Sequence, residues 1–182
     1  MKKIILSAVA VLAFGLANAQ EMKYGVKGGL NSSSLSGAEG ASSIMGIHLG
    51  GFAQFKVSDK FSVQPELLYS MQGAKFDGFG TLNMNYINIP VMAKYAVGEK
   101  FNLQAGPQIG FLMSAKVESV DVKDTTKSLD FGINFGAGYD LSDKLFLEAR
   151  YNLGLAQNQK ELAPGETAVT NAVIQISLGY KF

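Results

Sequence analysis

Among the residues that could carry chemistry, His48 is the only histidine in a chain of 182 residues, and no cysteine accompanies it. Histidine is the usual general base near neutral pH, and it could activate a serine such as Ser43 if a carboxylate oriented the ring. That arrangement depends on the fold rather than on sequence spacing, and the sequence contains no Gly-x-Ser-x-Gly elbow or phosphate-binding loop. We therefore expect His48 to belong to a polar network, and we expect no enzymatic activity.

A second group of residues places charge inside otherwise apolar segments. Its members alternate with apolar residues and are predicted to share one face with His48: Lys56, Glu66, Lys94, Glu148 and Arg150. Charges that face an interior must be paired or solvated. They predict either a salt-bridge and amide network that fills the interior, or a narrow polar passage in which the two carboxylates and the cations beside them set the ion preference.

The composition excludes several other kinds of site. The absence of Cys rules out disulfide frameworks, thiolate zinc sites and cysteine nucleophiles, and a single His rules out multi-histidine metal sites. A net charge of +1 is far below the basic balance of a nucleic-acid-binding domain. The acidic residues of the long polar stretches could bind a cation or a partner, although such residues are usually solvated: Asp121, Asp124, Glu161 and Glu166. No cofactor is expected.

The first 19 residues have the pattern of a cleavable signal peptide. Lys2 and Lys3 give a positive start, residues 4–16 form an apolar run, and residues 17–19 read Ala-Asn-Ala, a small-x-small cleavage pattern. The run is shorter than the roughly 20 residues of a transmembrane helix. The next residue is Gln20 rather than the Cys of a lipoprotein. We expect residues 20–182 to form one exported domain with 14 basic and 15 acidic residues, a net charge of −1.

The elements that must position the charged residues are strands, because hydrophobicity alternates with a period of two from Tyr24 onward. The alternation marks eight segments: residues 24–30, 47–57, 61–72, 87–95, 101–113, 129–139, 145–154 and 171–182. Three short turns between them repeat one pattern at spacings of 40 and 44 residues: 57–61, 97–101 and 141–145. Each turn holds polar residues or Gly between apolar anchors, as a tight hairpin requires.

Longer polar or glycine-rich stretches separate the hairpins, at residues 31–43, 72–83, 116–128 and 156–170. Short turns at one end and four long loops at the other predict an all-β, eight-stranded, antiparallel up-and-down barrel, whose closure removes both sheet edges. Pro65, Pro90 and Pro107 fall inside predicted strands at a similar height, where each removes a ladder donor. They predict a β-bulge at this level that would shift the strand register.

Glycine and aromatic residues indicate which face of the barrel is the interior. Glycines lie mainly on the face that carries the charges: Gly46, Gly50, Gly106, Gly110, Gly132, Gly136, Gly138, Gly154 and Gly179. An eight-stranded barrel is narrow inside, whereas glycines on its outside would only weaken the strands. The apolar rows carry aromatic residues beside the short turns, as at a membrane boundary: Phe55, Phe61, Tyr95, Phe101, Tyr139 and Tyr180. The sequence therefore predicts a transmembrane barrel with its apolar face toward lipid.

The signal peptide, the glycine-rich alternating strands, the repeated turns and the terminal Leu178-Gly179-Tyr180-Lys181-Phe182 resemble the outer-membrane protein beta-barrel family, the porin-family small barrel proteins of Gram-negative bacteria. The resemblance covers the mature chain. It implies an outer-membrane location, contacts with outer-membrane lipids, and recognition of the last strand by the barrel-assembly machinery, with Tyr180 and Phe182 as the assembly signal. Some small barrels of this membrane are lipid-modifying hydrolases, which keeps catalysis by His48 as a further hypothesis.

Together these features favour an integral outer-membrane barrel with a structural, adhesive or ligand-binding role through four extracellular loops. The short turns and both termini are then expected in the periplasm. The alternatives are a narrow pore for ions or small solutes and, less favoured, a lipid-modifying enzyme. A wide diffusion pore is excluded, because eight strands leave no open channel. The sequence identifies no extracellular ligand.

Overall fold

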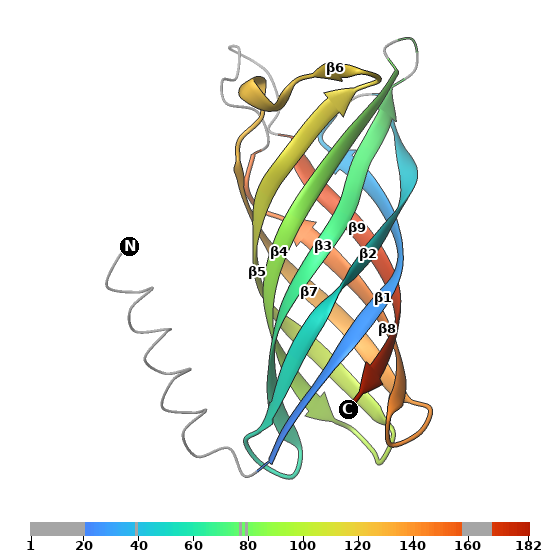
Figure 1. The fold of residues 1–182 in the computed structure, drawn as a ribbon, viewed down its shortest axis with the longest axis vertical. Coiled ribbons are helices and arrows are strands. Elements are labelled where there is room, and N and C mark those ends of the chain that lie inside the picture. The colour runs from blue at the N-terminus through green and yellow to red at the C-terminus, as the bar shows by residue number, and fades with distance from the viewer. Residues whose placement is uncertain (1–20, 39, 77, 79, 158–168) are drawn as a thin grey trace, which may run out of the picture.

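A computed structural model describes residues 21–38, 40–76, 78, 80–157 and 169–182, so the predicted signal peptide lies outside the described residues. Eight long strands form a closed antiparallel barrel in which each strand pairs with its neighbour in the barrel order and β1 pairs with β9 (Figure 1). The strands are β1 (Glu21–Ser36), β2 (Ala41–Lys56), β3 (Phe61–Phe76), β4 (Gly80–Ala96), β5 (Phe101–Val117), β7 (Leu129–Asp140), β8 (Leu145–Gly154) and β9 (Thr170–Lys181). No helix among the described residues has the length and apolar character needed to cross a membrane. The predicted eight-stranded up-and-down barrel is confirmed.

The three repeated turns form the same hydrogen bonds. In the first, the backbone N–H groups of Val57 and Ser58 both donate to the carbonyl oxygen of Phe61, at 2.9 and 3.0 Å. The same pair of bonds joins residues 97 and 98 to Phe101, and residues 141 and 142 to Leu145. β1 begins and β9 ends at this end of the barrel (Figure 1). We call it the turn end, and the opposite end the loop end.

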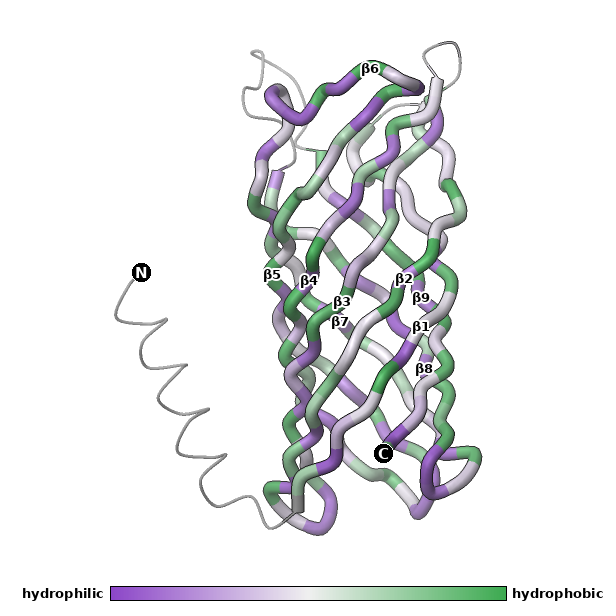
Figure 2. The backbone as a smooth tube through the Cα atoms, viewed as in Figure 1, coloured by the Kyte–Doolittle hydropathy of each residue, from purple (hydrophilic) through white to green (hydrophobic). Residues whose placement is uncertain are grey.

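Through the middle of the barrel, apolar side chains point outward and polar side chains point inward, which gives the alternating colours of Figure 2. On β8, for example, Leu147 and Tyr151 are exposed while Glu148 and Arg150 are buried. The burial pattern of the other strands agrees with the faces predicted from the alternation. An outer surface of large apolar side chains is the surface that lipid requires.

Strands β1 to β5 are longer than predicted, and two of the four predicted long loops are wrong. Residues 31–36 belong to β1 and residues 41–43 to β2, which reduces the predicted loop 31–43 to residues 37–40. The predicted loop 72–83 is likewise taken up by β3 and β4, with residues 77–79 between them. The third connection contains β6 (Val120–Asp121) and the 3-10 helix η1 (Lys123–Thr125). Most of the fourth, residues 158–168, lies outside the described residues.

The extra strand length was missed because the two faces exchange polarity toward the loop end. Ser32, Ser34, Lys75 and Asn83 continue the outward rows of their strands, while the inward rows become apolar. The inward residues form what we call the loop-end core: Leu35, Ala74, Met84, Tyr86, Leu112, Ala115 and Val169. An apolar interior under a polar outer face is the pattern of water-soluble β-structure. In the sequence, the polar outer rows resembled loops.

The prolines do not shift the register, contrary to the predicted bulge. Pro65 pairs with Val91 in the same register that holds along all of β3 and β4, and the pairings on both sides of Pro90 also agree. The register changes instead between Asn85 and Tyr86 on β4 and between residues 43 and 48 on β2. Each proline removes one ladder donor without inserting a residue, so the strands continue in phase.

Candidate functional site in the barrel lumen

Four charged side chains form the centre of the lumen, and we call them the ion cluster: Lys27 on β1, Glu66 on β3, and Glu148 and Arg150 on β8. The guanidinium of Arg150 donates to both oxygens of Glu66, Nη1 to Oε2 at 2.8 Å and Nη2 to Oε1 at 2.6 Å, and also to Glu148. Lys27 Nζ lies 2.7 Å from Glu66 Oε2 and 3.5 Å from Glu148 Oε2. All four residues are at most 4% exposed. Two cations therefore neutralise two carboxylates inside the barrel.

The ion cluster spans the full width of the lumen. In the closed ring of eight strands, β3 and β8 lie four strands apart in either direction, so they face one another across the barrel. The two-bond contact between Arg150 and Glu66 therefore bridges opposite walls. The Nε and Nη2 groups of Arg150 also donate to Gln104 Oε1 on β5, at 3.1 and 2.8 Å, which links the cluster to a third side of the wall. A passing ion would have to break these bonds.

His48 belongs to a neighbouring polar layer rather than to the ion cluster. Its Nδ1 lies 2.7 Å from Asn31 Oδ1, and its Nε2 lies 2.7 Å from Ser177 Oγ. Gln175 Nε2 also donates to Asn31 Oδ1, at 3.1 Å. Ser177, His48 and Asn31 are arranged as a nucleophile, a base and an orienting amide would be. However, Ser177 and His48 are only 1% and 2% exposed. A substrate carbonyl could not reach Ser177 Oγ without opening the barrel.

Ser43, the serine considered from the sequence, is exposed on β2 near the loop end and is not among the hydrogen-bond partners of His48. Ser177, which does contact His48, comes from the strand at the other end of the chain. Sequence spacing carried no signal for that pair, because the closure of the barrel brings β9 beside β1.

Two further contacts cross the lumen above and below the polar layers. Toward the loop end, Asn171 Nδ2 donates to Asp130 Oδ2 at 2.8 Å and to Tyr86 Oη on the opposite strand β4 at 3.4 Å. Toward the turn end, the rings of Phe52 and Phe146 meet edge to face with centroids 5.5 Å apart. The lumen is therefore filled in successive layers by aromatic, ionic, amide and apolar groups.

Gly179 leaves the space that the ring of Phe146 occupies in the aromatic layer. A Cβ at this position would lie 2.1 Å from Cζ of Phe146, so the ring occupies the place of a side chain on β9. The interior glycines thus have the steric purpose expected from the sequence. At Gly50 the reason is different, because a Cβ there would lie 2.0 Å from the carbonyl oxygen of Leu67 on the adjacent strand.

Lys94 and Lys56 hold different positions, although both were predicted in the lumen network. Lys94 is buried, donates to Gln64 Oε1 at 3.2 Å, and lies 5.3 Å from the ring centroid of Phe146. Lys56, in contrast to the prediction, is not part of the buried network. It lies at the rim of the turn end, where it pairs with the exposed Asp59 at 3.1 Å. It is one residue from the turn, so its long side chain lies at the mouth of the lumen, in contact with water, instead of in the buried network.

Lys27 is the one member of the ion cluster that the sequence analysis did not single out. The phase of β1 contained the signal, because Val26 and Leu30 are apolar and point outward, which turns Lys27 inward. The predicted first strand, residues 24–30, contains these positions, so its alternation could have identified Lys27. The structure thus brings Glu66, Glu148 and Arg150 together with Lys27, places Lys94 and His48 beside them, and leaves Lys56 outside.

Of the acidic loop candidates, Asp121 and Asp124 are described and lie on the surface. Asp121 Oδ1 accepts the backbone N–H of Lys123 at 2.9 Å within the third connection, while Glu161 and Glu166 lie outside the described residues. Over the described ranges, no three His, Asp or Glu side chains are grouped so that they could hold a metal ion. At the turn end, the ring centroid of Phe182 lies 5.6 Å from those of Tyr24 and Tyr180, in tilted and edge-to-face contacts, and the backbone N–H of Phe182 donates to the carbonyl oxygen of Tyr24.

Comparison with known proteins agrees with this architecture. The model of the outer membrane protein beta-barrel domain family matches residues 18–159. No curated protein matches the chain. Among solved structures, Neisserial surface protein A has a TM-score of 0.65 at 12% identity, with 90% of this chain and 100% of that chain covered. The attachment invasion locus protein Ail of Yersinia pestis has a TM-score of 0.55 at 12% identity and the same coverage.

A further structure of Ail, in complex with the heparin analogue sucrose octasulfate, matches with a TM-score of 0.50 at 12% identity, again over 90% of this chain and 100% of that one. At such low identity these structures share the fold alone with the present chain. The family model, in contrast, spans most of the sequence. The chain belongs to the outer membrane protein beta-barrel domain family, and it is an outer-membrane protein.

Proposed function

We propose that the chain is a non-conducting barrel that acts at the cell surface, as a binding or adhesion protein, through its loop end. The observation that carries the proposal is the pair of hydrogen bonds from Arg150 to Glu66 between opposite walls of the barrel. Because both residues are buried and their charges are matched by Lys27 and Glu148, the interior serves as a filling rather than as a passage.

The loop end offers the surface on which such a protein would act. Strands of 16 or 17 residues from β1 to β5 exceed the 9–11 or so that cross a bilayer. Their polar outer rows therefore project into water, supported from inside by the loop-end core. Long loops and projecting rims carry function in barrels of this kind because the scaffold below is rigid. The similarity to Ail, which is named as an attachment protein, supports an adhesive role by analogy of fold.

Conductance across a planar bilayer separates this proposal from a narrow pore. Purified wild-type protein and the Glu148→Ala variant should give no discrete current steps at moderate voltage. Reproducible unitary currents from the wild type would refute the non-conducting barrel and favour a passage in which Glu66 and Glu148 select ions. Currents from the variant alone would support the proposal, since they would locate the block at the ion cluster.

Binding at the loop end is tested on whole cells. A structure of Ail contains the heparin analogue sucrose octasulfate, so immobilised heparin is a suitable probe. Cells that display the chain should bind it more strongly than cells that do not. Replacing residues 118–128 by a short glycine-serine turn should reduce binding while the heat-modifiable mobility of the folded barrel is kept. If neither heparin binding nor attachment to host cells differs between displaying and non-displaying cells, the adhesive role is refuted.

We also propose that the chain is not an enzyme, because the His48–Ser177 pair is buried without access for a lipid. Lipid A and phospholipid profiles of cells with and without the chain should be the same. A change in acylation that disappears in the His48→Gln variant would overturn this part of the proposal.

A further inference from the structure

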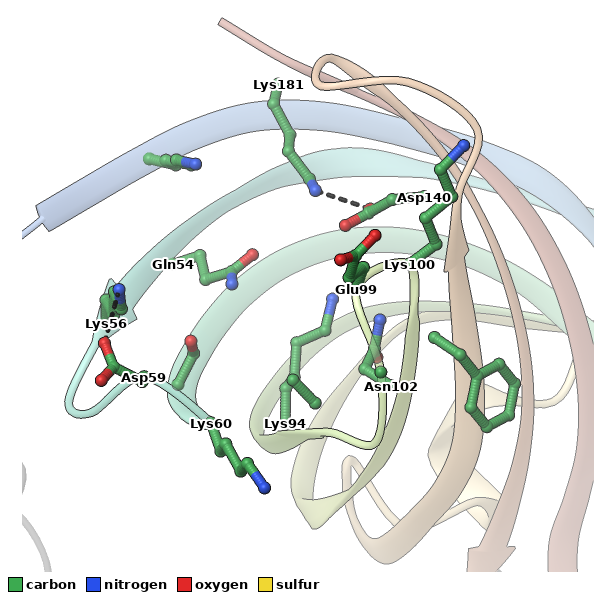
Figure 3. Close-up of a pocket in the computed structure, with 15 residues that line it drawn as sticks. Gln54, Lys56, Asp59, Lys60, Lys94, Glu99, Lys100, Asn102, Asp140 and Lys181 are labelled. Atoms are coloured by element: carbon green, nitrogen blue, oxygen red, sulfur yellow. Dashed lines mark hydrogen bonds and ion pairs between the residues drawn. The ribbon is translucent and has the colours of Figure 1, made fainter.

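The turn end of the barrel contains a cavity that the surface role does not use. Its volume is about 230 Å³, and it opens at the mouth of the lumen between the short turns (Figure 3). Six lysines line it: Lys23, Lys56, Lys60, Lys94, Lys100 and Lys181. The acidic residues of its lining are Asp59, Glu99 and Asp140. The formal charge of the lining is therefore +3, in a chain whose net charge is close to zero.

Among the residues of the lining, Lys94 most strongly favours an anion in this cavity. The residue is 6% exposed, and among the described residues no carboxylate lies within ion-pair distance of its ammonium group. Its partners are a neutral amide oxygen of Gln64 at 3.2 Å and the ring of Phe146. The nearby carboxylates of the ion cluster, Glu66 and Glu148, already pair with Lys27 and Arg150. Burying an ammonium without a carboxylate in contact is costly, so a negative group beside it would be favoured.

A second ammonium reaches the same space from another wall. Lys181 Nζ on β9 also lies 5.3 Å from the centroid of Phe146, and it pairs with Asp140 at 2.6 Å. Figure 3 shows Lys94 and Lys181 extending into the cavity from different strands, with Asp140 and Glu99 near their ends. An ammonium group has three donors, so Lys181 can bind a further acceptor besides Asp140. An oxyanion between the two ammonium groups would complete their coordination.

The size of the cavity suits a small anion. Its volume is below that of typical drug-sized pockets and matches a phosphate group with a short substituent.

From these observations we infer that the turn-end cavity binds a phosphate ester, with its phosphate group beside Lys94 and Lys181. Lysine ammonium groups are common phosphate ligands because they act as compact point charges. The same glycerophosphate chemistry occurs in a soluble ester and in the headgroup of phosphatidylglycerol. The inference does not depend on the adhesive role at the loop end.

The test is a titration of the folded mature chain in dodecyl maltoside, a detergent without phosphate, with glycerol 3-phosphate at low salt. Saturable NMR shifts should appear at the backbone amides of Lys94, Asn102 and Lys181, and glycerol alone should cause none. Lys94→Gln should raise the dissociation constant about tenfold or more, which is the effect of losing a hydrogen bond to a charged group. Lys144→Gln is the matched control: it removes one charge at the same end, but Lys144 lies over Tyr180 and does not line the cavity.

Several outcomes would overturn the inference. The absence of saturable shifts in the wild type would do so directly, and so would equal weakening by Lys94→Gln and Lys144→Gln, which would indicate only general attraction. If Lys94→Gln does not fold, the double variant Lys60→Gln/Lys100→Gln replaces it, since both residues are exposed; it should weaken binding severalfold, and unchanged binding would count against the site. Phosphatidylglycerol added to the micelles, compared with phosphatidylcholine, identifies the source. If phosphatidylglycerol competes with glycerol 3-phosphate, the ligand of the cavity is a lipid headgroup. If it does not compete, the ligand is a free phosphate ester.

Discussion

Replacing Arg150 by methionine tests whether the ion cluster holds the barrel together. Methionine keeps an unbranched stem of similar length but removes the five hydrogen bonds of the guanidinium to Glu66, Glu148 and Gln104. Both carboxylates then share Lys27, which lies 2.7 Å from one and 3.5 Å from the other. Removing one partner from a buried ion pair typically costs about 3–5 kcal/mol, because a charge is left unpaired away from water. We expect a loss of that size in the free energy of unfolding.

The assay is urea-induced unfolding of the chain in lipid vesicles, followed by circular dichroism and by heat-modifiable gel mobility. The matched control is Lys56→Met, which removes the rim pair with Asp59 and should change the free energy of unfolding by less than about 1 kcal/mol. The double variant Glu148→Gln/Arg150→Met should cost less than the sum of the two single variants, because the two side chains interact. If Arg150→Met costs no more than Lys56→Met, the cluster is hydrated and the proposed block of the lumen fails.

Three other substitutions address other parts of the barrel. Gly50→Ala should lower the free energy of unfolding in urea by about 1–3 kcal/mol, because its Cβ would meet the Leu67 carbonyl oxygen, while Gly98→Ala, where a Cβ meets nothing within 4 Å, should be neutral. Leu112→Ala should cost about 2–4 kcal/mol and speed amide hydrogen exchange in the loop-end core; equal acceleration at the ion cluster would contradict an independent core. Phe182→Ala should reduce the yield of folded barrel in cells but not spontaneous folding into vesicles, and an equal loss in both would show a purely structural role of the ring.

The fold and the inward face of the middle of the barrel could be predicted from the sequence because a single physical rule governs them. Lipid outside and a narrow polar lumen inside impose period two on every strand, so Glu66, Glu148 and Arg150 could be assigned to one face without knowing the register. Which of them meet could not be predicted. The contact of Glu66 with Arg150 joins residues 84 apart on opposite strands, and only closure of the barrel determines that distance.

The errors of the sequence analysis arise where that rule stops applying. Lys56 follows the inward phase but lies next to a turn, so its flexible stem reaches water and Asp59. The prolines suggested a bulge because they lack a donor, yet a missing donor and an inserted residue are separate events. The bulge between Asn85 and Tyr86 is instead adjacent to the boundary where the faces exchange polarity.

That exchange of polarity supports the role at the cell surface that we propose for this membrane barrel. Below the boundary, lipid solvates the outside, and charges such as Arg150 must be matched inside. Above it, water solvates the outside, and the interior can hold Met84, Tyr86 and Leu112 as an ordinary apolar core. The apolar core needs no contribution from the bilayer, because its stabilisation comes from removing apolar groups from water. The projecting rim can therefore keep its shape above the membrane while its outer residues vary freely, which is the property that a binding surface on a barrel requires.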